Sequence, residues 1–173
     1  MLDVNCGYDE ATAIEVGPLL HRHGVTWFEE PIPPGDPAAL ARVRAKSSVP
    51  IAAGESEIHF NVVRDQIDLG GIRFVQWDCT RAGGLTEGLR IAAYAMAHGA
   101  QIAYHHDPQI HGHLMAAQPH GYCVESFPSV PRDPFWHQVL TVKPKLEAGK
   151  LTLGEEPGFG YEVDWKMIER YKV

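Results

Sequence analysis

Six acid or imidazole side chains recur along this chain at intervals of 26, 26, 23, 27 and 20 residues. They are Asp3, Glu29, Glu55, Asp78, His105 and Glu125. Each lies at or near the C-terminal end of a short apolar run. A period of about 25 residues accommodates one strand, one helix and two loops. In a β/α barrel the functional residues stand at the carboxyl ends of the strands. The spacing therefore predicts an α/β fold, a modified TIM-type (β/α)8 barrel of which about six βα units are present.

Helix-like segments lie between these positions. The segment 9–23 predicts a helix, which Gly17 and Pro18 should kink or split because proline removes a backbone donor. Thr86 leads a second strong helical pattern, with an apolar stripe of Leu89, Ala93 and Met96. Strand and helix alternate six times, which is typical of parallel βα units. Short strands are expected at 25–28, 51–54, 74–78, 101–105 and 122–125.

The composition changes after residue 126. We expect residues 1–126 to form the partial barrel and residues 127–173 to form a C-terminal extension that packs back on it. The extension is rich in proline and aromatic residues and lacks a helical period. Within it, 151–153 indicates a returning strand and 165–171 a closing helix.

Charge and cysteine usage exclude several classes of protein. The net charge of −7 gives no electrostatic support for a nucleic-acid partner. No apolar run reaches the roughly 18 residues of a membrane span, so no membrane partner is expected. The three cysteines lie far apart, which argues against a disulfide framework and favours a reducing, cytoplasmic location.

Three carboxylates, those of Asp3, Glu29 and Glu55, come from successive predicted strands. If the strands are neighbours, the carboxylates converge and repel one another unless a cation lies among them. Oxygen ligands favour Mg²⁺ over zinc. The alternative is that each acid is only a loop residue or a helix cap. That interpretation is weaker, because three acids at equal spacing all stand at predicted strand ends.

Asp78 and His105 are predicted on adjacent strands. A carboxylate that accepts a hydrogen bond from an imidazole orients the ring and raises its basicity, so His105 could exchange a proton at neutral pH. Glu125 could hydrogen-bond a substrate carboxylate or stabilise developing charge. The structural alternatives are a core histidine for His105 and a salt-bridge acid for Glu125.

Four more histidines crowd the same region, and their spacing matches no standard zinc pattern. We expect them to be solvated loop or pocket-rim residues rather than metal ligands: His106, His111, His113 and His120.

Together these residues resemble the enolase superfamily, and most of all its mandelate racemase subgroup with the acid sugar dehydratases. The resemblance rests on the ordered set Asp3-Val4-Asn5, Phe28-Glu29-Glu30-Pro31, Ala53-Gly54-Glu55, Asp78 with Gly83-Gly84-Leu85-Thr86, and Tyr104-His105. It runs from residue 2 to about residue 125.

The resemblance implies Mg²⁺ held by Asp3, Glu29 and Glu55, with an acid sugar carboxylate bound to it. His105, oriented by Asp78, would act as general base or as the acid that assists loss of a β-hydroxyl. Glu125 would hydrogen-bond the substrate carboxylate, and Asn5 is expected to contact the substrate or a metal ligand. The metal would stabilise the enediolate formed on removal of the α-proton.

The family pattern also sets limits. The Asp78–His105 pair disfavours lactonisation, because the cycloisomerases of the related subgroup carry lysine at the Asp78 position. The family's capping domain and the Lys-x-Lys of its second strand are not present, so we expect the chain to begin at the third barrel strand. The extension would pack on the barrel or on that capping domain. In the full-length parent a homo-oligomer is expected.

We therefore expect a parent enzyme that is an Mg²⁺-dependent acid sugar dehydratase, a hydro-lyase, whose isolated 173-residue chain is weakly active or inactive. A racemase or epimerase of 2-hydroxy acids is the alternative within the fold. The alternative that is not an enzyme is a catalytically incomplete fragment that serves in assembly.

Overall fold

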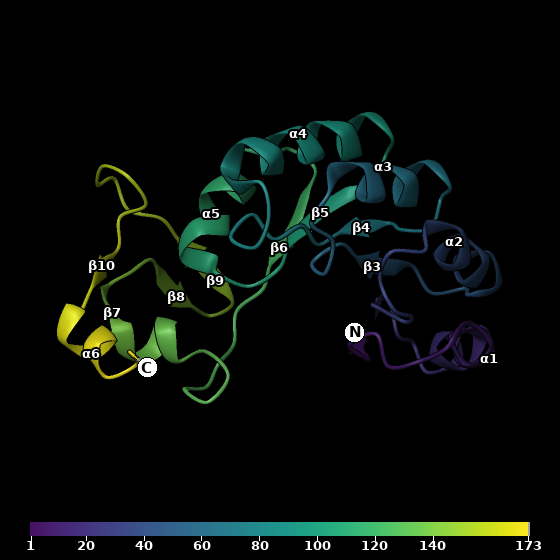
Figure 1. Ribbon diagram of the computed structural model, residues 1–173, viewed down its shortest axis with the longest axis horizontal. Coiled ribbons are helices and arrows are strands. Elements are labelled where there is room, and N and C mark those ends of the chain that lie inside the picture. The colour runs from purple at the N-terminus through teal and green to yellow at the C-terminus, as the bar shows by residue number, and fades with distance from the viewer. Residues whose placement is uncertain (173) are drawn as a thin grey trace.

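The computed structural model describes residues 1–172, so Val173, the last residue of the predicted extension, lies outside the described residues. The first 124 residues alternate strictly between strand and helix (Figure 1). The strands are β1 (Leu2–Asp3), β2 (Phe28–Glu29), β3 (Ile51–Ala53), β4 (Phe74–Val75), β5 (Gln101–Tyr104) and β6 (Gly121–Val124). The helices are α1 (Glu10–Arg22), α2 (Pro37–Lys46), α3 (Phe60–Asp68), α4 (Gly84–Ala97) and α5 (Pro108–Ala116).

The six strands form one parallel sheet in the order β1-β2-β3-β4-β5-β6, which matches their order in the sequence. Figure 1 shows the helices following one another along one side of this curved sheet. The arrangement is six consecutive units of a β/α barrel, with β1 and β6 as open edges. The predicted incomplete TIM-type barrel is confirmed.

Two apolar layers lie on opposite faces of the sheet. The larger one packs the sheet against the helices and includes Ile51, Val75 and Ile102. The smaller one lines the inner face and consists of Trp27, Ala52, Phe74 and Ala103 with Cys123 against them. Because neighbouring strand residues point to opposite faces, the functional side chains can share the inner face with the smaller layer.

The inner layer contains an aromatic stack drawn from alternate strands. The ring of Phe74 on β4 lies 4.6 Å from that of Trp27, which directly precedes β2, and 4.7 Å from that of Tyr122 on β6. In β/α barrels each interior layer is built from alternate strands in this way. The stack therefore fills the barrel interior below the carboxyl ends of the strands.

Helix caps explain several boundaries. The Asp9 carboxylate accepts a hydrogen bond from the Thr12 amide at 2.7 Å, and Asp36 accepts one from the Ala39 amide at 2.8 Å. Both satisfy donors that a helix N-terminus leaves free. The predicted split of α1 is wrong, since Glu10–Arg22 is one helix with Pro18 inside it.

The predicted apolar stripe of α4 is also wrong. Its buried face consists of Gly88, Ile91, Ala92 and Ala95, whereas Leu89 is 47% exposed and Met96 is 50% exposed. Three of these four residues are small, which lets the helix approach the sheet closely, and Ile91 is the one large side chain among them.

The chain after β6 forms smaller elements at the far end of the sheet from the N-terminus (Figure 1). They are η1 (Phe135–Val139), β7 (Leu140–Val142), β8 (Lys145–Glu147), β9 (Lys150–Thr152), β10 (Glu162–Val163) and α6 (Trp165–Glu169). The pairs β8–β9 and β7–β10 are both antiparallel. The expected returning strand and closing helix correspond to β9 and α6.

Candidate active site

All six recurring side chains lie at the carboxyl ends of the parallel strands, on the same side of the sheet. Asp3 and Glu29 are the last residues of β1 and β2, and they are register partners. Glu55 follows β3 after Gly54, whose φ of +129° is available to glycine alone among ordinary residues. Asp78, His105 and Glu125 follow β4, β5 and β6 in the same way.

The imidazole of His105 joins three of these carboxylates. Its Nδ1 lies 2.8 Å from Asp78 Oδ2, and its Nε2 lies 3.3 Å from Glu55 Oε1 and 3.7 Å from Glu125 Oε2. One ring nitrogen is thus occupied by the buried Asp78, and the other faces the space between Glu55 and Glu125. This is the geometry of an oriented acid/base histidine.

Asp78 is a fixed anion. Burial opposes its ionisation, but the hydrogen bond to His105 and those from the hydroxyl and amide of Thr80 outweigh it and lower the pKa of Asp78 to about 2. Burial alone would lower the pKa of His105, yet the bond to Asp78 and the charges of Glu55 and Glu125 raise that pKa. Asp78 therefore makes His105 a stronger proton acceptor than a free imidazole.

Glu29 is held in place by two donors. Trp27 Nε1 and Gln76 Nε2 each donate to one of its carboxylate oxygens at 2.7 Å. Burial raises the pKa of Glu29, and the charges of Asp3 and Glu125 add to that effect, while the two hydrogen bonds oppose it. Trp27 lies two residues before Glu29, and Gln76 lies two residues before Asp78. The alternation of extended backbone could therefore have identified both donors from the sequence.

Glu55 carries the strongest sign of crowded negative charge. Burial is the main cause that raises its pKa to about 8, and the carboxylates of Glu30, Glu29 and Glu125 raise it further against the opposing effect of His105. A divalent cation in this region would compensate that charge.

A ready metal site is not formed within residues 1–172, where no three His, Cys, Asp or Glu side chains are grouped to hold an ion. Asp3 is exposed, and its two carboxylate oxygens accept hydrogen bonds from the amide and Nδ2 of Asn5, each at 2.8 Å. The donor set nevertheless fits Mg²⁺ chemically, because it consists of carboxylate oxygens from three neighbouring strands. The Asn5 contacts join it to Asp3, and whether Asn5 meets a substrate or a metal ligand stays a prediction.

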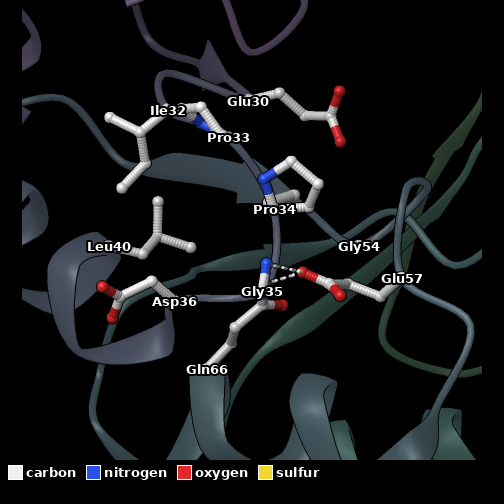
Figure 2. A pocket seen from close by; sticks show the side chains of 11 residues that line it. Glu30, Ile32, Pro33, Pro34, Gly35, Asp36, Leu40, Gly54, Glu57 and Gln66 are labelled. Atoms are coloured by element: carbon white, nitrogen blue, oxygen red, sulfur yellow. Dashed lines mark hydrogen bonds between the residues drawn. The ribbon is translucent and has the colours of Figure 1, made fainter. Parts of the chain in front are cut away.

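Hydrogen bonds to the Glu57 carboxylate fix the loop that follows Glu30. Figure 2 shows the Glu57 side chain reaching the backbone of Gly35, and Gln66 approaches the same carboxylate. Glu57 Oε1 accepts from the Gly35 amide at 3.1 Å and from Gln66 Nε2 at 2.9 Å. These buried hydrogen bonds join the loop that follows β2 to the loop that follows β3. Glu29 ends β2, and Glu55 lies in the loop after β3.

One of the four neighbouring histidines contradicts the expectation of solvated or pocket-rim residues. His111 is fully buried. His106, His113 and His120 are partly buried. Sequence spacing did not indicate this, because the burial of His111 depends on how α5 packs over the loops after β4 and β5.

A cavity of about 350 Å³ opens beside the cluster on the inner face of the sheet. It is lined by Glu29, Gln76 and Glu125 from the site, by Trp27 below, and by Leu146 of the extension. The cavity therefore gives access to the carboxylates of Glu29 and Glu125. In the part of the chain that the structure describes, no helix is both long and apolar enough to cross a bilayer.

Comparison with known proteins agrees with this geometry. Residues 1–167 match the family described as Enolase C-terminal domain-like. The chain is 32% identical over 162 residues to the L-talarate/galactarate dehydratase of Salmonella typhimurium, covering 93% of this chain and 39% of that protein. It is 30% identical over 184 residues to the D-galactarolactone cycloisomerase of Agrobacterium fabrum, covering 100% of this chain and 49% of that protein.

Among solved structures, the L-talarate dehydratase of Polaromonas sp. JS666, complexed with Mg and L-glucarate, superposes with a TM-score of 0.86 at 26% identity. The alignment covers 96% of this chain and 45% of that one. The chain thus spans less than half the length of these three relatives.

Proposed function

We propose, since the chain belongs to the Enolase C-terminal domain-like family, that it supplies most of the active site of an Mg²⁺-dependent acid sugar dehydratase. The observation that carries this proposal is the orientation of the His105 ring. Its Nδ1 is held by Asp78, and its Nε2 is directed between the carboxylates of Glu55 and Glu125. Relatives that act on galactarate or bind glucarate support an acid sugar as the substrate class.

Asp3, Glu29 and Glu55 would hold Mg²⁺. When bound, the ion would stabilise the negative charge that develops on the substrate carboxylate. His105 Nε2 takes the proton from the carbon next to that carboxylate, while Asp78 keeps the ring oriented. The electron pair left on that carbon forms the new double bond as the C–O bond to the β-hydroxyl breaks. The leaving hydroxyl takes a proton from the His105 imidazolium, or from a second acid, and departs as water. The enol that remains takes up a proton at the next carbon and becomes the 2-keto-3-deoxy acid. Glu125 hydrogen-bonds the substrate carboxylate.

The test is product analysis on a panel of six-carbon mono- and diacid sugars, with Mg²⁺, in deuterated water. A 2-keto-3-deoxy acid supports the proposal. Inversion of the α-centre without loss of water supports the racemase or epimerase alternative. The cycloisomerase relative makes conversion of a sugar acid lactone a further alternative, which a lactone substrate in the panel would reveal.

Metal dependence separates an enzyme from a module that serves only in assembly. We expect Mg²⁺ to raise the melting temperature of the chain and Glu55→Gln to abolish that rise. Glu15→Gln is the matched control, because Glu15 is an exposed residue of α1. Equal Mg²⁺ responses in the two variants would argue against the assigned carboxylates.

We also propose that the isolated 173-residue chain turns over slowly or not at all, since its sheet has six strands and the chain spans less than half the length of the relatives it matches. Robust turnover by the isolated chain would refute this part of the proposal. The expected homo-oligomer and cytoplasmic location of the full-length protein remain part of the same proposal.

A further inference from the structure

His111 has two backbone partners on two different loops. Its Nδ1 lies 2.7 Å from the carbonyl oxygen of His106, and its Nε2 lies 3.1 Å from the amide nitrogen of Cys79. The ring is fully buried and stacks on Tyr104 with 5.2 Å between centroids and 6° between planes. Nothing in this environment leaves the ring free to turn.

These partners fix the protonation state of the ring. A backbone N–H can only donate, so Nε2 must present its lone pair to Cys79. A backbone carbonyl can only accept, so Nδ1 must carry the proton that goes to His106. His111 is therefore a neutral imidazole in a single tautomer. Burial also lowers the pKa of His111, which agrees with this assignment.

The two backbone groups adjoin the acid/base pair. Cys79 follows Asp78 directly, and His106 follows His105 directly. His106 has a φ of +47° and Asp107 a φ of +43°, a left-handed conformation that costs energy for residues other than glycine. Contacts must hold that turn, and His111 supplies one, while Glu125 accepts from the His106 amide at 3.1 Å.

We propose that His111 is a positioning residue, a neutral two-ended bridge that sets the distance between Asp78 and His105 by joining the backbones of their loops. The bridge acts through the loops, since the hydrogen-bond partners of His111 are the backbone groups of His106 and Cys79. His111 Nε2 also lies 3.6 Å from Asp78 Oδ1, beyond hydrogen-bond distance. Its importance for catalysis rests on the proposed function, but the bridge itself does not.

The first test measures the tautomer directly. In the 173-residue chain labelled with ¹⁵N-histidine, a two-bond ¹H–¹⁵N correlation spectrum distinguishes protonated from unprotonated ring nitrogens. We expect the His111 signal, identified by its loss in His111 variants, to show Nδ1 protonated and Nε2 unprotonated, unchanged from pH 8 to pH 6. An Nε2–H tautomer or an imidazolium at pH 7 would overturn the proposal.

The second test measures the chemical shift of the proton in the Asp78–His105 hydrogen bond in two complementary His111 variants. His111→Asn keeps a donor near Nδ1 and loses the acceptor for Cys79, whereas His111→Gln keeps an acceptor near Nε2 and loses the donor for His106. The downfield proton of the His105 Nδ1–H bond to Asp78 should move upfield or disappear in both. His113→Asn is the matched control, because His113 lies two residues away on α5 and contacts the Phe159 carbonyl at 3.1 Å.

The proposal fails if the downfield proton is unchanged in folded His111 variants, or if His113→Asn shifts it equally. If the His111 variants do not fold, the tautomer measurement on the unaltered chain still decides. Neither readout needs turnover, so a chain that dehydrates no sugar but shows both signals rejects the proposed function and keeps the bridge.

Discussion

At the scale of single residues, the buried polar contacts of the site have consequences for stability. His111 is neutral in the folded chain, and its folded pKa lies below the ordinary 6.5. The unfolded chain therefore binds more protons as the pH falls through that range, so the stability from His111 is present above about pH 6.5 and is lost below it.

We predict that His111→Gln lowers the free energy of unfolding at pH 7.5 by about 1–3 kcal/mol, because one buried backbone group loses its partner. The difference in unfolding free energy from the unaltered chain should narrow at pH 5.5, because protonation of His111 in the unfolded state lowers the stability of the unaltered chain there. Urea titrations at both pH values measure this, with His113→Gln as the control from the same helix. A difference that stays constant with pH would contradict the prediction.

A second residue-scale prediction concerns Glu29, whose buried carboxylate has Gln76 as one of its two donors. Gln76→Leu removes that donor, and we expect it to lower the free energy of unfolding at pH 7 by about 1–3 kcal/mol. The half-buried Gln118 provides the control through Gln118→Leu, which should change stability far less. Equal effects would mean that the Gln76 amide does not support Glu29.

At the scale of elements, Gly17 of α1 packs closely against Ser47, the residue that caps the C-terminus of α2. A Cβ added at Gly17 would lie 2.9 Å from Ser47 Cβ and 3.1 Å from Ser47 Cα. Alanine normally stabilises a helix interior by about 1 kcal/mol over glycine. Here the contact with backbone should cost about 1–3 kcal/mol, so we predict that Gly17→Ala destabilises the chain. Thermal unfolding measures this, and the exposed Glu15→Ala should have little effect.

The elements also show what could be predicted from sequence. Strand ends and their acids repeat with a simple period, so the carboxylate series and the Asp78–His105 pair were predictable. The uninterrupted α1 was not, because proline removes one donor while the helix is held by packing at Ala13 and Gly17, its two buried residues. The buried face of α4 and the bridge of His111 depend on distances between elements, which no local pattern records.

At the scale of the whole molecule, the sheet leaves two strand edges open, at β1 and β6. Tyr122 on β6 is 47% exposed and ends the aromatic stack that Trp27 and Phe74 begin. In a closed barrel this inner surface and both edges are covered by further strands. The isolated chain exposes them, and open edges promote pairing between chains.

We therefore predict that the isolated chain associates as its concentration rises, and that Tyr122→Lys shifts it toward the monomer by placing a charge at the β6 edge. Leu89→Lys is the matched control, because it removes a similarly exposed apolar side chain from the helical layer. Sedimentation velocity over a range of concentrations measures the association. A chain that stays monomeric throughout, or one in which Leu89→Lys is as effective as Tyr122→Lys, would show that the open sheet edges do not drive self-association.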